Sequence, residues 1–162
     1  MKINIRVGHG YDVHPFADNR KLILAGVEIP YERGLAGHSD ADVLYHALCD
    51  ALLGAVGQGD IGHHFPDTNA QYKNTDSALF VSQTVKLLKT LGWEIGNVDC
   101  TIMAQEPRLA PYVPHMKKNM AALLLVSEQD VNIKATTTER LGFIGRKEGI
   151  AAEAVALVSR NR

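Results

Sequence analysis

Asp12 and His14 are the first residues of the sequence whose types and spacing predict a metal site. They stand two positions apart near the amino terminus, after a stretch in which Ile3, Ile5 and Val7 alternate with polar residues. Successive side chains of an extended chain point to opposite faces, so Asp12 and His14 share a face. A carboxylate and an imidazole placed in this way can bind one cation, but a third ligand is needed to complete a site.

His46 is the candidate third ligand. On a helical wheel the apolar positions of its segment occupy one half, and His46 lies just outside that half, where a helix meets a sheet. One carboxylate and two imidazoles leave a fourth position open, which is the ligand pattern of catalytic zinc. The same spacing also fits a half-buried histidine that is hydrogen-bonded to a strand, and Asp42 and Cys49 are weaker competitors as ligands.

Two further segments predict phosphate binding. His38 to Asp40 stands where we expect a helix to begin, and free backbone N–H groups and the helix dipole favour an anion there. Plain N-capping by Ser39 is the more common use of such a sequence. The second segment, Lys134 to Glu139, contains three consecutive threonines after a predicted strand, with Arg146 a short distance on.

The chemistry of the second segment suits a diphosphate and a metal ion. Its threonines supply hydroxyl and amide groups, Lys134 and Arg146 supply positive charge, and Glu139 can hold a hard cation such as magnesium. Taken alone, a threonine-rich strand end also fits a β-branched surface strand with a polar turn.

Composition predicts one compact cytoplasmic domain over residues 1–162. The chain is 46% hydrophobic and 22% charged, with a net charge of -1, so it offers no broad basic surface for nucleic acid. We find no apolar run of membrane-spanning length and no signal-peptide core. Cys49 and Cys100 lie in apolar segments and are expected to be buried free thiols.

The elements that must position these residues alternate between strands and helices in the second half of the chain. This predicts an α+β fold: a two-layer sandwich in which helices cover one side of a mixed β-sheet. After the first strand, Gly8 and Gly10 permit a bulge or the close approach of a ligand. Strands are expected at Leu22 to Ala25, Val27 to Ile29, Ile95 to Met103, Val131 to Thr136 and Ile150 to Val158. Helices are expected from an N-cap at Ser39 or Asp40 to Gly54 or Gly57, from Asp76 to Leu91, and from Pro111 to Leu125.

The least regular stretch is Gln58 to Asn74, which carries a Pro66-Asp67 turn signal. It is interpreted either as a mobile functional loop or as an ordinary connector.

Together these motifs resemble one family, the 2-C-methyl-D-erythritol 2,4-cyclodiphosphate synthases of the non-mevalonate isoprenoid pathway. The resemblance covers nearly the whole chain, and the motifs occur in the family's order. They are His9 to His14, His38-Ser39-Asp40, Gly59 to Gly62, Phe65 to Thr68, Gly96 to Asp99, Lys134 to Glu139, Leu141 to Phe143, and Arg146 to Ala151.

The resemblance implies an intramolecular reaction. The 2-phosphate of a cytidine-diphosphate-linked methylerythritol attacks the β-phosphate, closes a cyclic diphosphate and expels CMP. Asp12, His14 and His46 would bind zinc or another divalent transition metal, and Glu139 would bind Mg²⁺ or Mn²⁺. His38 and Thr137 match the positions that orient the phosphates and stabilise the transition state.

The resemblance also implies a set of substrate-binding residues and a homotrimer with active sites between subunits. Phe143, Arg146 and Glu148 match positions around a central channel that holds isoprenoid diphosphates in some family members. The implied substrate-binding residues are Asp12, Val13, His14, His38, Ser39, Asp60, Ile61, Gly62, Phe65, Pro66, Asp67, Thr68, Asn69, Ala104, Gln105, Glu106, Pro107, Arg108, Leu109, Ala110, Thr136, Thr137, Thr138, Glu139, Phe143 and Arg146.

Two alternatives stay open at this point. Two histidines and one carboxylate also suit Fe(II), as in a non-haem iron oxygenase, although the phosphate features of Lys134 to Glu139 argue against it. The other alternative is a non-catalytic trimer that binds an isoprenoid diphosphate or a nucleotide and turns nothing over.

Overall fold

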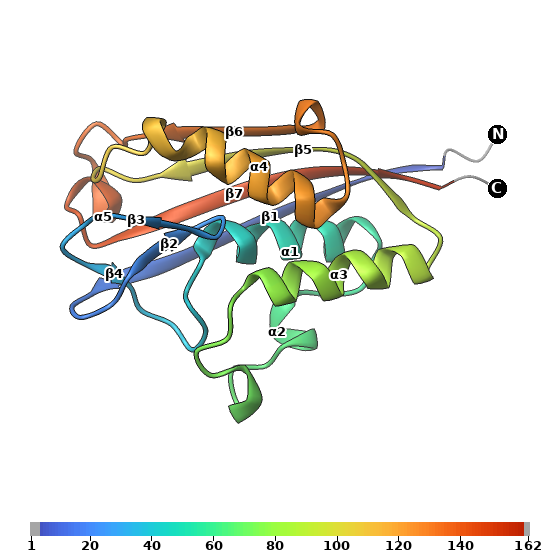
Figure 1. Ribbon diagram of the computed structural model, residues 1–162, viewed down its shortest axis with the longest axis horizontal. Helices are drawn as coiled ribbons and strands as arrows, with labels where there is room; N and C mark the ends of the chain where they lie inside the picture. The colour runs from blue at the N-terminus through green and yellow to red at the C-terminus, as the bar shows by residue number, and fades with distance from the viewer. Residues whose placement is uncertain (1–3, 161–162) are drawn as a thin grey trace.

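A mixed β-sheet packed against helices forms the body of the protein, as the sequence predicts. The computed structural model describes residues 4–160. Its five-stranded sheet has the order β4-β1-β7-β5-β6, in which only the β5–β6 pair is parallel, and β2 and β3 form a separate hairpin (Figure 1). The strands are β1 Ile5–Ala17, β2 Leu22–Leu24, β3 Val27–Ile29, β4 Gly34–Leu35, β5 Glu94–Met103, β6 Val131–Thr136 and β7 Gly149–Ser159.

Helices cover one face of the sheet, with α1 against β1 and β7, α4 against β6, and α3 packed against both of these helices (Figure 1). The helices are α1 Val43–Ala55, α2 Ile61–His64, α3 Ala78–Thr90, α4 Val113–Leu124 and α5 Gly142–Gly145. Short 3₁₀ turns lie at Ala70–Tyr72, Ala110–Tyr112 and Glu128–Asp130. None of the helices within residues 4–160 is long and apolar enough to cross a membrane. Cys49 and Cys100 are buried free thiols, as expected, and burial raises the pKa of each to about 12.

The first strand is longer and more regular than the sequence indicates. It pairs with β7 without interruption from Ile5 opposite Ser159 to Pro15 opposite Gly149, so Gly8 and Gly10 mark no bulge. Their lack of a side chain serves a different purpose, the close approach of α1. A Cβ atom on Gly8 would lie 1.8 Å from the Ala51 carbonyl oxygen, and one on Gly10 would lie 1.9 Å from that of Ala47.

This close packing sets the position of the predicted metal ligands. Asp12 and His14 follow Gly8 and Gly10 at alternate positions of β1, so all four residues face α1. Because the helix backbone lies directly against the strand, a side chain on α1 can reach the two ligands.

The predicted start of α1 is wrong by a few residues. The N-cap is Asp42, whose carboxylate accepts hydrogen bonds from the backbone N–H groups of Tyr45 at 3.2 Å, Ala25 at 3.0 Å and Gly26 at 2.8 Å. Burial and the nearby charge of Asp40 raise the pKa of Asp42 to about 7, although the three N–H donors oppose this shift. Asp42 therefore ties the β2–β3 turn to α1 and is not a metal ligand.

The opposite face of the sheet carries exposed apolar side chains. On β1 these are Ile5, Val7, Tyr11 and Val13, and on β7 the exposed one is Val155. Their odd-numbered positions alternate with the residues that face α1, so they lie on the face that the three long helices leave open. Several exposed apolar side chains on one sheet face are typical of an interaction site, and the polar pair His9 and Glu153 lies among them.

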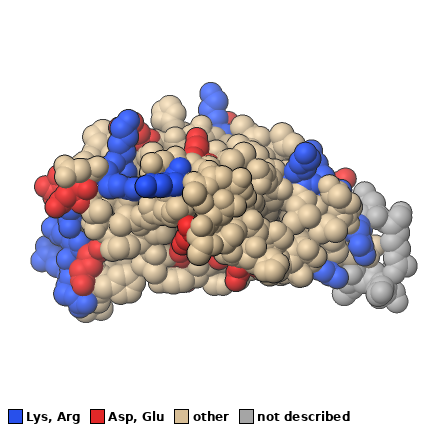
Figure 2. All heavy atoms as spheres, turned by 90° about the horizontal axis from the view of Figure 1, so that it is seen from below, with Lys and Arg blue, Asp and Glu red and all other residues tan. Residues whose placement is uncertain are grey.

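Lysine and arginine side chains do not form a continuous basic surface on the side of the molecule shown in Figure 2. Most of them lie towards its two ends, where acidic side chains are also present, one stands near the middle of the upper edge, and the rest of the middle is largely uncharged with scattered acidic side chains. Phosphate binding on this side must therefore depend on local groups rather than on an overall positive field.

Candidate functional site

Asp12, His14 and His46 meet as the spacing predicts. His14 Nε2 lies 2.9 Å from Asp12 Oδ2 and 3.1 Å from His46 Nδ1, and His46 Nδ1 lies 3.1 Å from the same Asp12 oxygen. Ligand atoms of a tetrahedral zinc ion, at about 2.0–2.1 Å from the metal, stand about 3.3 Å apart. The three atoms thus already form a triangle close to the size that a single metal ion needs, and this donor set fits a divalent ion.

The charges of the triad favour a cation. Burial alone would raise the pKa of Asp12, but hydrogen bonds from His14 and His46 lower it well below its usual value. Burial would lower the pKa of His46, yet its contact with the Asp12 carboxylate outweighs this and raises it. Asp12 is therefore ionised at neutral pH, and its negative charge is directed at the two imidazoles.

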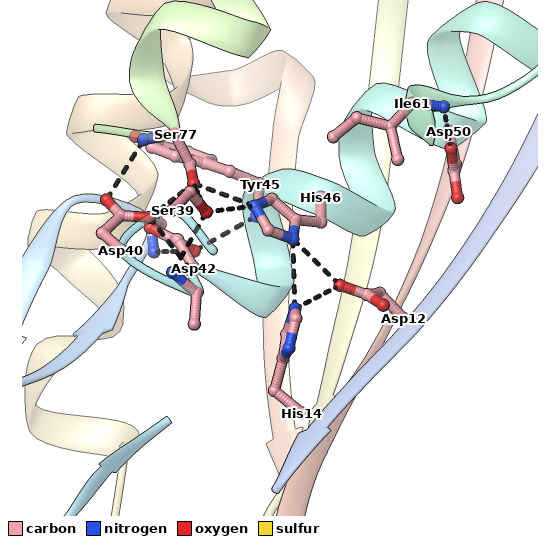
Figure 3. Close-up of polar contacts among 12 residues, drawn as sticks. Asp12, His14, Ser39, Asp40, Asp42, Tyr45, His46, Asp50, Ile61 and Ser77 are labelled. Carbon is pink, nitrogen blue, oxygen red and sulfur yellow. Dashed lines mark hydrogen bonds and ion pairs between the residues drawn. The ribbon is translucent and has the colours of Figure 1, made fainter. Parts of the chain in front are cut away.

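His46 is held on its other side by two serines (Figure 3). Its Nε2 lies 2.9 Å from Ser77 Oγ and 3.1 Å from Ser39 Oγ. Ser77 Oγ in turn donates a hydrogen bond to the Asp40 carboxylate. Sequence reasoning missed Ser77, which lies 31 positions from His46 and stands just before α3 with no local pattern to mark it.

A hollow of about 430 Å³ opens beside the triad. Its walls come from β1, from the segment before α1, from α1 and α3 themselves and from the loop between these two helices. The lining residues are Asp12, His14, Gly37, His38, Ser39, His46, Ile61, Gly62, Phe65, Pro66, Asp67, Tyr72 and Phe80. Gly37, Tyr72 and Phe80 were not expected from the sequence. The structure thus brings the predicted metal and sugar-phosphate residues to one place.

Four expected residues of this region lie differently, and one of them, Thr68, is exposed and does not line the hollow. Val13 is on the opposite face of β1 and does not line the hollow. Asp60 caps α2, where its carboxylate accepts the His63 N–H at 2.8 Å. Asn69 caps the 3₁₀ turn, and its carbonyl oxygen lies 3.2 Å from His38 Nε2.

The helix-dipole argument for His38 and Ser39 is wrong. Because α1 begins at Val43 and Asp42 caps it, His38 and Ser39 precede the helix by several residues. Both residues still line the hollow, but they do so from a bent segment that is hydrogen-bonded to the end of the loop. The Asn74 N–H donates to the His38 carbonyl at 2.8 Å, and the Asp40 N–H donates to the Thr75 carbonyl at 3.0 Å.

A second hollow of about 370 Å³ contains most of the residues expected to hold a nucleotide. It is lined by residues 104–110 and by Ala135, Thr136 and Thr137. Glu139 and Arg140 follow in a turn with left-handed backbone, at φ 54° and 62°, and the Arg140 N–H donates to Gln105 Oε1 at 3.0 Å.

The other residues expected near this end do not line either hollow. Thr138 closes the turn by donating its hydroxyl to the Leu141 carbonyl at 2.7 Å. Phe143 is exposed, and Arg146 forms an ion pair with Glu148 at 2.7 Å.

The two hollows are separate within one chain. In the sheet register Val13 stands opposite Ala151, Ala151 opposite Met103, and Met103 opposite Thr136. Thr136 therefore lies three strands from the metal-bearing β1, or about 14 Å at about 4.8 Å per strand. The hollows share no lining residue.

Comparison with known proteins gives consistent matches over almost the whole chain. The model of the YgbB family matches residues 5–159. The 2-C-methyl-D-erythritol 2,4-cyclodiphosphate synthase of Thiobacillus denitrificans is 62% identical over 96% of this chain and 98% of its own length. The synthase of the same name from Halalkalibacterium halodurans is 60% identical over 95% of this chain and 98% of its own.

Solved structures agree with these matches. The bifunctional IspDF of Campylobacter jejuni has a TM-score of 0.95 and 46% identity, over 99% of this chain and 43% of that longer one. The IspF of Plasmodium falciparum in complex with CDP has a TM-score of 0.86 and 33% identity, over all of both chains.

Proposed function

We infer the function of this chain from its membership of a family: the chain belongs to the YgbB family, to which the 2-C-methyl-D-erythritol 2,4-cyclodiphosphate synthases belong. It converts 4-diphosphocytidyl-2-C-methyl-D-erythritol 2-phosphate into 2-C-methyl-D-erythritol 2,4-cyclodiphosphate and releases CMP. This is a step of the non-mevalonate pathway to isoprenoid precursors. The inference depends chiefly on one observation. The chain matches 2-C-methyl-D-erythritol 2,4-cyclodiphosphate synthases over almost its full length, with 62% identity to the Thiobacillus denitrificans enzyme. The match over residues 5–159 also supports a single synthase domain over 1–162.

The Asp12, His14 and His46 triad would hold zinc or another divalent transition metal. Its carboxylate and two imidazoles suit such an ion, and three protein ligands leave a position free for a phosphate oxygen. A metal bound there supplies Lewis-acid polarisation of that oxygen. Glu139 would hold a second ion, Mg²⁺ or Mn²⁺, since a carboxylate is a hard oxygen ligand.

The hollow beside the triad would hold the methylerythritol 2-phosphate. Ser39 and Gly62 would offer a hydroxyl and a backbone N–H, the apolar side chain of Ile61 would line the hollow, and Asp60 caps the start of α2. The segment from Phe65 to Asn69 would close over the sugar. No protein nucleophile is required, because an oxygen of the 2-phosphate forms the new bond to the β-phosphorus. The bond from that phosphorus to the bridging oxygen breaks, and CMP leaves with the oxygen.

His38 and Thr137 would orient the phosphates and stabilise the charge that develops on them. Such a contribution is positional and electrostatic, as phosphoryl transfer requires. Residues 104–110 and 136–138 would hold the cytidine and its diphosphate, largely through backbone groups, with the Arg108 charge near the diphosphate. The CDP complex of the Plasmodium falciparum relative supports a cytidine nucleotide as the ligand.

We propose that the active enzyme is a homotrimer. One chain holds the triad hollow and the nucleotide hollow three strands apart, and an assembly of neighbouring subunits would bring the triad hollow of one chain beside the nucleotide hollow of another. The apolar side chains of β1 and β7 on the open face of the sheet suit burial between subunits. Phe143, Arg146 and Glu148 would then surround a central channel able to hold an isoprenoid diphosphate.

The function is tested by following the reaction with phosphorus NMR. With zinc and magnesium, the purified protein is expected to turn the cytidine-linked 2-phosphate into equal amounts of CMP and cyclic diphosphate. Chelation of the metals should stop the reaction, and their return should restore it. Release of CMP without a cyclic product would instead show a hydrolase. Tight binding of the nucleotide with no product at all would support the non-catalytic binding trimer.

The trimer is tested by light scattering at micromolar concentration. The expected mass is three times the 17.7 kDa of one chain. A charge at an apolar position of the open face, as in Val155→Glu, should lower the mass and the cyclase activity together, because charge burial in an interface is costly. Leu125→Glu is the control, because Leu125 is 64% exposed at the carboxyl end of α4. A monomeric mass for the unaltered protein would reject the trimer.

A further inference from the structure

We propose that Ser77 and Asp40 are positioning residues for the metal ligand His46, and that they leave the hydroxyl of Ser39 free for the substrate. The proposal rests on the metal centre described above. It assigns different tasks to two serines that contact the same imidazole nitrogen.

The two ring nitrogens of His46 face different surroundings. Nδ1 lies 3.1 Å from both the Asp12 carboxylate and His14 Nε2, on the ligand side. Nε2 points the other way, to Ser77 Oγ and Ser39 Oγ (Figure 3). A histidine that binds a metal through one nitrogen donates the N–H of the other to an acceptor, which fixes its tautomer and the orientation of its ring.

The hydrogen bonds of Ser77 leave its Oγ able to accept the N–H of His46 Nε2. Its hydroxyl proton is committed to Asp40 Oδ1, so a lone pair of Oγ remains for the imidazole N–H. The backbone N–H of Ser77 donates to Asp40 Oδ2 at 3.1 Å, which fixes the serine from a second direction. Ser77 is fully buried, so water does not compete for these bonds.

Asp40 connects this arrangement to the helix that carries His46. Its Oδ1 also accepts the N–H of Asp42, the N-cap of α1, at 3.1 Å. The carboxylate therefore joins the start of α1 to Ser77, at the start of α3, and places the acceptor at a fixed distance from the imidazole. Its negative charge, passed on through the serine hydroxyl, strengthens the hydrogen bond from the imidazole N–H and makes Nδ1 a better ligand.

Ser39 has a different set of contacts. It lines the hollow beside the triad, whereas Ser77 does not. Its Oγ lies 3.1 Å from His46 Nε2 and 3.3 Å from Ser77 Oγ, and it accepts the Ala41 N–H at 3.2 Å. None of these contacts commits its proton to a carboxylate. The Ser39 hydroxyl can therefore turn to a phosphate oxygen in the hollow while Ser77 keeps the imidazole in place.

The test is zinc affinity, measured by competition with a chromophoric chelator at fixed pH, together with KM in the cyclisation assay. Ser77→Ala is expected to raise the zinc Kd about tenfold, within the about 10–100-fold range for the loss of such a partner. Ser39→Ala should change the zinc Kd less than about threefold and raise KM instead. The rise in zinc Kd of the double variant should exceed the product of the rises in the two single variants, because in Ser77→Ala the imidazole N–H can still bond to Ser39.

Two outcomes would overturn the proposal. One is a zinc Kd for Ser77→Ala within twofold of the unaltered protein, and the other is an equal rise in Kd for the two single variants. If circular dichroism shows that Ser77→Ala does not fold, the zinc Kd of Asp40→Asn is measured in its place. This variant keeps one oxygen for the Ser77 hydroxyl proton but removes the charge and the acceptor of the Ser77 backbone N–H. A rise in Kd of at least threefold supports the proposal, and a smaller change rejects it.

The same measurements separate this proposal from those on which it rests. Absence of stoichiometric zinc binding in the unaltered protein would reject the metal centre itself. Tight zinc binding without cyclisation would reject the proposed reaction and leave the positioning role intact.

Discussion

His46→Ala is expected to abolish tight zinc binding and to lower cyclase turnover on the order of a thousandfold, the equivalent of about 4 kcal/mol of lost transition-state stabilisation. The substitution removes one of three ligands that lie within about 3 Å of one another. Asp12 and His14 would remain paired at 2.9 Å, but two side chains do not close a zinc site. Elemental analysis after dialysis, together with the phosphorus NMR assay, measures both effects.

His115→Ala is the matched control for that variant. It removes the same side chain from an exposed position on α4, outside both hollows, so zinc content and turnover should not change. A full zinc complement in His46→Ala would contradict the ligand assignment. A loss of zinc in both variants would point to a general effect of removing a histidine and not to this site.

Local periodicity is the reason that the metal triad could be predicted from the sequence. Strand alternation places Asp12 and His14 on one face, and the helical wheel places His46 at the border of the apolar half of α1. Both rules depend on neighbours within a few positions. The strand predicted at Val131 to Thr136 also depends on local sequence, and β6 has these same bounds in the structure.

The errors arise where contacts distant in the chain decide the outcome. Ser39 and Asp40 resemble N-cap residues, but Asp42 takes that position because it also receives the N–H groups of Ala25 and Gly26 from the β2–β3 turn. Ser77 reaches His46 only after α3 has packed beside α1, and no local pattern encodes that. The separation of the two hollows likewise follows from strand order, which the sequence alone did not reveal.

Gly8 and Gly10 are a further case in which contacts distant in the chain decide what the residues do. From the sequence they allow a bulge or a nearby ligand, whereas in the structure they admit the backbone of α1. Only the pairing of β1 with β7 on both sides of the glycines, and the helix above them, distinguishes these uses. The short distance between β1 and α1 is also what lets His46 reach Asp12 and His14, so the glycines contribute to the metal site without touching it.

Gly10→Ala is therefore expected to lower the free energy of unfolding by about 3 kcal/mol or more and to weaken zinc binding at the same time. The new Cβ would lie 1.9 Å from the Ala47 carbonyl oxygen and 2.8 Å from the Ala51 nitrogen. Both are backbone atoms, so no change of rotamer relieves the clash, and α1 must move away from β1 and take His46 with it. Overpacking of a core typically costs about 1–3 kcal/mol, out of a total stability of about 5–15 kcal/mol.

Gly54→Ala, in α1 itself, provides the control for Gly10→Ala. A Cβ there would meet only the His9 carbonyl oxygen, at 4.0 Å, which is an ordinary contact. Because alanine is favoured over glycine inside a helix, this variant should be neutral or more stable by up to about 1 kcal/mol. Urea denaturation of the metal-free proteins and zinc titration measure both variants. If Gly10→Ala matched Gly54→Ala in stability and zinc affinity, close contact between the α1 and β1 backbones would not be what positions His46, and the ligand would have to be placed by the Ser77 and Asp40 contacts alone.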